Sequence, residues 1–131
     1  MALTTGLNHL GLAVKDLDQT TGFFVDVLGW TLIARDDSYP RTTVTDGSLR
    51  LTLWQTDAGA RDFDRRAQIG LHHLAISVPD EATLNGLAET LSTTEGVEIA
   101  FLPELMGSGP RKHMMFHEPG GLRLELVWAG V

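Results

Sequence analysis

A short pattern occurs twice in this sequence, and the duplication constrains the fold more than any other feature. Residues 8–16 read NHLGLAVKD and residues 72–80 read HHLAISVPD, which places His73 exactly 64 positions after His9 (73 minus 9). Two copies of one pattern in one chain predict two copies of one supersecondary unit.

A second match in the same order supports the duplication. Residues 47–53, GSLRLTL, correspond to residues 120–126, GGLRLEL, at a spacing of 73 positions (120 minus 47). The second copy is therefore nine residues longer between its two matches (73 minus 64). We expect one domain with a first module of about residues 1–66 and a second of about residues 67–131.

Both modules show the same order of predicted elements. Leu10, Leu12 and Val14 alternate with small or polar residues, which indicates a strand with one apolar face. A helix is expected after Asp16, followed by strands near 30–35, 40–45 and 49–55. The second module repeats this order with a strand at 72–78, a helix at 81–94 and strands near 97–102, 111–117 and 121–128. The prediction is an α+β fold made of two βαβββ modules.

The composition excludes several classes of function. Ten Lys and Arg against seventeen Asp and Glu give a net charge of -7, which argues against a nucleic-acid partner and against an anionic membrane surface. The absence of cysteine excludes disulfides, cysteine nucleophiles and thiolate metal sites. The sequence has neither a long apolar run nor a secretory leader at its start, so a cytoplasmic location is expected.

His9 and His73 each begin the strand face opposite the apolar one. The next residues on that face in the second module are Ala75 and Ser77, whose small side chains leave room for a pocket. Two structural histidines at strand starts are the alternative.

Glu125 stands in the alternating stretch LRLELVW, although glutamate is uncommon inside strands. Its position places it opposite the leucine face, where a carboxylate has to be solvated, paired or bound to a metal. An ion pair with Arg50 or Arg123 is one alternative. Two imidazoles and one carboxylate are a recurrent ligand set for divalent first-row metals, so His9, His73 and Glu125 are candidate metal ligands.

Further candidates lie on the strand over 111–117. His113 is a candidate catalytic residue, acting in acid–base chemistry or from the outer shell of the metal, because imidazole titrates near neutral pH. A surface histidine is the alternative. The residues expected to face a substrate are Tyr39, Arg41, Arg111 and Met115.

The motifs NHLGLAVKDL, HHLAISV and FHEPGGLRLEL resemble the vicinal-oxygen-chelate superfamily over essentially the whole chain. That group includes glyoxalase I, bleomycin-resistance proteins, fosfomycin-resistance thiol transferases and extradiol dioxygenases. The resemblance implies curved mixed sheets around a pocket that holds a metal, with ligands from the first and last strand of each module. The corresponding residues here are His9, Thr52, His73 and Glu125. It also implies a homodimer, which open sheet edges favour independently.

Three departures from the family pattern narrow the expected reaction. Glyoxalase I and methylmalonyl-CoA epimerase patterns place Glu or Gln where this chain has Thr52, so we assign Thr52 to the substrate pocket rather than to the metal. The transferases usually carry threonine at the position of Gly11, and the dioxygenases carry tyrosine at the position of Met115.

The sequence therefore predicts a metal-dependent enzyme that acts on a small oxygen-rich molecule. Its divalent ion (Fe, Mn, Co, Ni or Zn) would serve as a Lewis acid in a reaction of dioxygenase, lyase or thiol-transferase type. The alternative is a metal-free protein that binds a small molecule or drug, like the bleomycin-resistance proteins.

Overall fold

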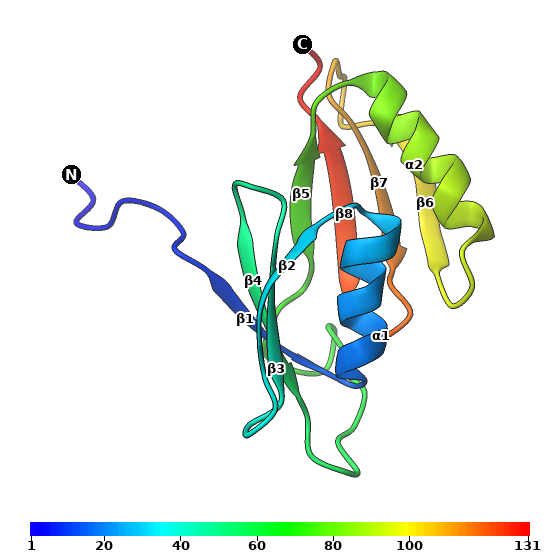
Figure 1. The fold of residues 1–131 in the computed structure, drawn as a ribbon. Coiled ribbons are helices and arrows are strands. Elements are labelled where there is room, and N and C mark those ends of the chain that lie inside the picture. Colours follow the sequence, from blue (N-terminus) through cyan, green and yellow to red (C-terminus); the bar gives the residue numbers. More distant parts are fainter. The chain divides into compact units, whose positions relative to one another are not determined.

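Two four-stranded mixed sheets make up the β structure, one in each of two units (Figure 1). The computed structural model describes residues 1–131, and its two units are Met1–Ala60 and Arg61–Val131. The α+β class and the two βαβββ modules predicted from the duplication are confirmed.

The first unit has the strand order β1-β4-β3-β2, in which β1 is parallel to β4 and the other pairs are antiparallel. Its elements are β1 (Leu10–Val14), α1 (Leu17–Gly22), β2 (Thr31–Asp36), β3 (Arg41–Thr45) and β4 (Arg50–Gln55). The helix continues beyond α1 as a π-helical stretch, Phe23–Val27, before the chain turns at Gly29 with φ of 74°. Glycine adopts this left-handed conformation without steric cost, which explains where the helix ends.

The second unit repeats this topology with the order β5-β8-β7-β6, and β5 is parallel to β8. Its elements are β5 (Leu74–Val78), α2 (Glu81–Thr93), β6 (Glu98–Leu105), β7 (Lys112–His117) and β8 (Arg123–Trp128). The two parallel pairs have equivalent registers, because Gly11 lies opposite Thr52 and Ala75 lies opposite Glu125. The repeat in the sequence is thus a repeat in strand register.

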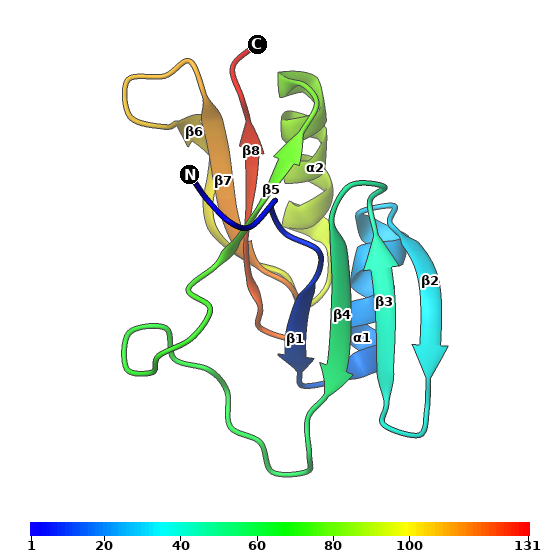
Figure 2. The same ribbon diagram turned by 90° about the vertical axis from the view of Figure 1, so that its left-hand side faces the viewer.

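Each helix packs on one face of its own sheet and buries the apolar side of the alternating strands (Figure 2). The core residues include Leu51 and Leu53 of β4 in the first unit and Leu124 and Leu126 of β8 in the second. Leu84 of α2 is fully buried against the second sheet. Neither helix has the length and apolar character needed to cross a lipid bilayer.

β6 differs from its predicted bounds because it runs on to Leu105 and pairs irregularly with β7. The register shifts between Ile99 and Phe101 and again between Phe101 and Glu104. Pro103 lies in the second interval and has no N–H to donate to a ladder. An edge strand tolerates such a residue, and β6 forms the edge of its sheet.

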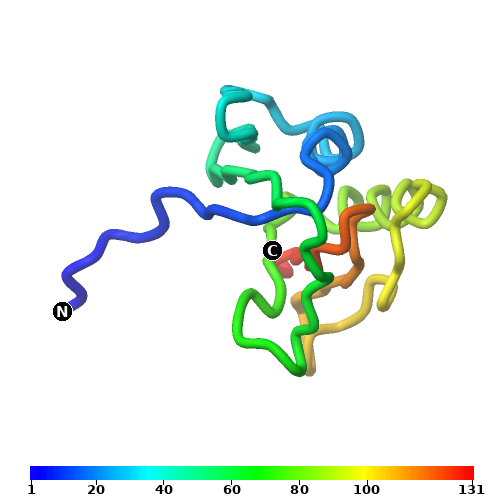
Figure 3. Tube along the Cα trace, turned by 90° about the horizontal axis from the view of Figure 1, so that it is seen from below, coloured from blue at the N-terminus to red at the C-terminus, as the bar shows by residue number.

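The first nine residues do not belong to the core. They are exposed and lead as an extended tail to the start of β1 (Figure 3). His9 is the last of them, so this candidate ligand precedes its strand rather than lying within it.

Asp80 begins α2 by accepting a hydrogen bond from the backbone N–H of Thr83 at 2.7 Å. Asp16 holds the equivalent position at α1, where it accepts from the backbone N–H of Gln19 at 3.0 Å. The bonds from Thr83 lower the pKa of the Asp80 carboxyl below its ordinary value of 3.8.

We expect Asp80→Ala to lower the Tm by a few degrees at pH 7, because the first turn of α2 loses its acceptor. Asp80→Asn should lose less, since its amide oxygen accepts the same bond. The folded state lowers the pKa, so the carboxylate's contribution is present above pH 3.8 and is lost as the pH falls through the lower folded value. Thermal melts of the three proteins from pH 7 to acid test this. Equal Tm values for wild type and Asp80→Ala at pH 7 would contradict it.

Candidate metal centre

A buried carboxylate lies on the face of the second sheet opposite the helix-covered core. Leu124 and Leu126 of β8 belong to the core, and Glu125 between them points the other way with 4% of its surface exposed. Its neighbours across the sheet are Ala75 of β5 and Met115 of β7. Since burial of an unpaired carboxylate is costly, its surroundings have to compensate the charge.

Two imidazoles approach the two oxygens of Glu125 separately. Oε2 lies 3.0 Å from Nε2 of His73, and Oε1 accepts a hydrogen bond of 2.8 Å from Nδ1 of His113. The His113 side chain is 17% exposed and that of His73 34%. The structure therefore brings together two candidate ligands, Glu125 and His73, and the candidate catalytic residue His113.

The other ring nitrogen of His73, Nδ1, contacts His72, which in turn contacts Arg123. Nδ1 of His72 lies 3.3 Å from the Arg123 guanidinium and 2.8 Å from Nδ1 of His73. Arginine only donates, so Nδ1 of His72 is the acceptor, and the proton between the two rings belongs to His73. Desolvation and the charge of Arg123 lower the pKa of His72, which favours its role as an acceptor.

This hydrogen-bond pattern fits a metal ligand. With its Nδ1 proton directed to His72, the ring of His73 presents Nε2 to Oε2 of Glu125. In an octahedral site with bonds of about 2.1 Å, neighbouring donor atoms are about 3 Å apart. The 3.0 Å between these atoms is equally the distance of an ion pair between a protonated imidazole and a carboxylate. Outer groups that set the tautomer of a ligating histidine are a regular feature of metal sites.

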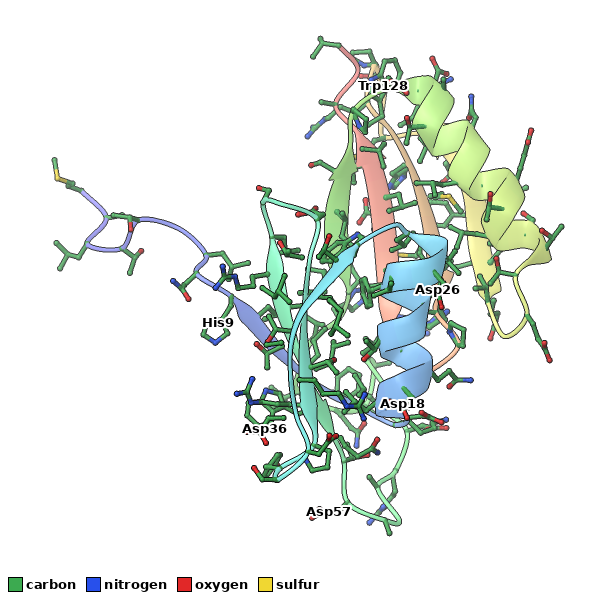
Figure 4. All side chains as sticks on the ribbon, viewed as in Figure 1. His9, Asp18, Asp26, Asp36, Asp57 and Trp128 are labelled. Atoms are coloured by element: carbon green, nitrogen blue, oxygen red, sulfur yellow. The ribbon has the colours of Figure 1, made fainter.

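The third candidate ligand, His9, belongs to the other unit. It is exposed beside the start of β1 and its Nδ1 lies 2.7 Å from the side-chain oxygen of Asn8 (Figure 4). His9 stands two residues before Gly11, as His73 stands two before Ala75, so its register is equivalent. The structure contains no group of three His, Asp or Glu side chains arranged to hold a metal ion. The ligand role of the three residues stays a prediction.

Three predicted substrate residues of the first unit lie on β4 or beside it. Thr52 is 9% exposed and lies opposite Gly11 and Thr43 in the sheet, on the face equivalent to that of Glu125. The rings of Tyr39 and Trp54 meet edge to face, with their centres 4.9 Å apart. The Arg41 guanidinium lies 5.6 Å from the centre of the Trp54 ring. Their contact with a substrate stays a prediction.

The other two predicted substrate residues occupy different surroundings. Met115 is buried beside Glu125, whereas Arg111 is exposed at the β6–β7 connection, where its carbonyl accepts from the Met106 N–H. A substrate role for either residue stays a prediction.

Sequence reasoning missed two residues that contact His113 from β6. The ring of Phe101 lies 4.9 Å from the imidazole, and a carboxylate oxygen of Glu104 lies 3.9 Å from Nε2. The irregular pairing of β6 places both residues against β7. The strand predicted from the sequence ends at residue 102, which places Glu104 outside the sheet. No local sequence pattern indicates the two shifts of register that bring Phe101 and Glu104 against His113.

Nearly the whole chain matches a known family. Residues 6–126 match the model of the Glyoxalase/Bleomycin resistance protein/Dioxygenase superfamily. The chain belongs to this superfamily. The resemblance of its repeated motifs to the vicinal-oxygen-chelate proteins is thereby confirmed.

Members of the superfamily similar to this chain carry different names. A 2-epi-5-epi-valiolone epimerase from an Actinomyces species is 30% identical in an alignment 145 residues long. The alignment covers 92% of this chain and 78% of the epimerase. A catechol-2,3-dioxygenase from Bacillus subtilis (strain 168) is 26% identical over 95 residues, which cover 72% of this chain and 33% of the dioxygenase. The crystal structure of a glyoxylase/bleomycin resistance protein/dioxygenase domain from Frankia sp. EAN1pec is 26% identical, with a TM-score of 0.81 over 96% of this chain and 93% of that domain.

Superfamily membership establishes the fold but leaves the reaction open, because one fold supports several chemistries. Which of these chemistries a member supports depends on the side chains of its site. Thr52 and Glu125 occupy equivalent positions in the two parallel strand pairs, yet only Glu125 offers a carboxylate. The first module therefore has no carboxylate at the position that Glu125 occupies in the second.

Proposed function

We propose that this chain is a divalent-metal-dependent enzyme acting on a small oxygen-rich molecule, with His9, His73 and Glu125 as metal ligands. The observation that carries the proposal is the buried Glu125 carboxylate, whose Oε2 faces the Nε2 of His73 at 3.0 Å. The equivalent register of His9 supports its place in the same ligand set. A bound divalent ion supplies a Lewis acid that stabilises negative charge on a substrate oxygen.

Among the reactions of the superfamily, we propose an epimerisation at the carbon beside a carbonyl group. The similarity to the valiolone epimerase extends over 92% of this chain and favours a polyhydroxylated cyclic ketone as substrate. The match to the catechol dioxygenase spans only 33% of that protein. Met115 beside Glu125 lacks the phenol group of the tyrosine that the ring-cleaving pattern carries at this position. Both points weaken ring cleavage relative to proton transfer.

The first unit offers groups suited to such a substrate. Thr43 and Thr52 pair across β3 and β4, and Arg41 and Trp54 form the next pair on the same face. Hydroxyl, indole N–H and guanidinium groups bind the oxygens of a polyol, and an aromatic ring packs against its C–H bonds. We propose that this face, with Tyr39, binds the substrate, and we keep Met115 and Arg111 as the candidate substrate residues of the second unit.

Metal binding is the first test of the proposal. About one equivalent of Mn²⁺, Fe²⁺, Co²⁺, Ni²⁺ or Zn²⁺ should raise the Tm of metal-stripped protein, because a ligand that binds the folded state stabilises it. His9→Ala, His73→Ala and Glu125→Ala should each remove most of this increase. Calorimetric titration and thermal melts measure both effects. An unchanged Tm with all five metals would contradict the proposal and favour a metal-free binding protein.

Thr52→Val provides the matched control, because it replaces the hydroxyl with a methyl group of similar size at the position equivalent to Glu125. We expect its metal affinity to stay within about threefold of wild type. A loss as large as that of His73→Ala would instead make Thr52 a ligand.

The reaction is tested by solvent exchange. Metal-loaded protein incubated with 2-epi-5-epi-valiolone in D₂O should place deuterium on the carbon beside the carbonyl and generate the epimer, as followed by NMR. Glu125→Ala should slow exchange by about a hundredfold, since charge stabilisation in the transition state is lost. Methylglyoxal with glutathione should react very slowly or not at all. Efficient turnover of that pair, without exchange into the cyclic ketone, would reject epimerisation in favour of a lyase.

We further propose a homodimer. Each four-stranded sheet has two open edges, and the edge strand β2 exposes Leu32 and Ile33, each at 44%. Open edges with apolar side chains are normally covered. Sedimentation should give about twice the 14.3 kDa mass of the chain.

Co-refolding His9→Ala with Glu125→Ala should restore part of the activity if each site draws ligands from two chains. A 14.3 kDa species at micromolar concentration would reject the dimer.

A further inference from the structure

His113 is held on three sides within the second unit. It lies on β7, which pairs with both β6 and β8, so its backbone is fixed by two ladders. Phe101 packs against its ring at 4.9 Å, and Nδ1 bonds Glu125 at 2.8 Å. A carboxylate oxygen of Glu104 lies 3.9 Å from Nε2. A ring confined in this way keeps a single orientation relative to Glu125.

The direction of the bond between His113 and Glu125 follows from the groups themselves. An ionised carboxylate only accepts hydrogen bonds, so Nδ1 of His113 carries the proton that it donates to Oε1. The other oxygen, Oε2, faces Nε2 of His73 instead. The two imidazoles thus contact different oxygens of the carboxylate, and in the proposed site Oε2 is the oxygen that would bind the metal.

We propose that His113 is a positioning residue, which holds Oε1 of Glu125 through its Nδ1–H and thereby presents Oε2 to the metal ion. The proposal rests on the proposed function in one respect, the role of Glu125 as a ligand. Outer-shell partners of ligating carboxylates typically contribute a factor of about 10 to 100 in metal affinity. His113 acts through Glu125, so its effect has to be visible in metal binding itself, apart from turnover.

The test compares two nearly isosteric replacements. In His113→Asn, the side-chain amide nitrogen stands where Nδ1 stood and still donates to Oε1, whereas His113→Leu has no donor. We expect the Co²⁺ affinity of His113→Leu to fall by about 10- to 100-fold and that of His113→Asn to stay within about threefold of wild type. Calorimetry of the full-length metal-stripped proteins gives both values. Should His113→Leu not fold, His113→Ala replaces it.

His117→Leu is the matched control. His117 lies on the same strand and the same sheet face, pairs with Arg123 and makes no bond to Glu125. Its Co²⁺ affinity should equal that of wild type. The visible spectrum of each variant at saturating Co²⁺ adds a second readout, because a positioning residue leaves the ligand set and hence the band positions and intensities unchanged.

Each outcome is decisive. Wild-type affinity in His113→Leu, or equal losses in the Leu and Asn variants, overturns the positioning role. A changed spectrum at saturating Co²⁺ in His113→Asn overturns it in favour of direct ligation by His113. Failure of the wild-type protein to bind Co²⁺ overturns the proposed function and this inference with it, and is distinguished by the wild-type titration alone.

Discussion

The parallel pairing of the first and last strand of each module positions every candidate ligand. β5 and β8 are separated by a helix and two strands in the chain, yet their pairing sets Ala75 directly opposite Glu125 and brings His73 into contact with that carboxylate. The same pairing of β1 with β4 sets Gly11 opposite Thr52. A βαβββ unit can close this pair only because its helix crosses over one face, which leaves the other face free for polar side chains.

The free face of the second unit is organised around one buried charge. Glu125 divides its oxygens between His73 and His113, and His73 in turn bonds His72, which lies beside Arg123. A buried carboxylate such as Glu125 is tolerated only when hydrogen-bond partners compensate its charge. The arrangement leaves the Nε2 of His73 and the Oε2 of Glu125 facing each other at 3.0 Å, the contact on which the proposed function rests.

The duplicated modules have diverged in chemistry while keeping their register. Where the second unit has Glu125 with its imidazoles, the first has Thr52 beside Thr43, followed on the same face by Trp54 with Arg41 and Tyr39. One copy thus carries a carboxylate between two imidazoles, and the other carries hydroxyls, a guanidinium group and aromatic rings on the equivalent face.

The sequence by itself determined the repeated βαβββ order, the equivalence of His9 with His73, and the position of Glu125 opposite the leucine face of its strand. These follow from period-2 alternation and from matches at constant spacing, both of which are local properties of the chain. Only the tertiary structure decided which groups meet Glu125. Contact among His73, His113 and Glu125 depends on strand pairing between distant segments. The approach of Phe101 and Glu104 to His113 depends on register shifts in β6. Pro103 lies within the second of these shifts. The packing of the whole sheet, rather than any local pattern, sets where the pairing resumes.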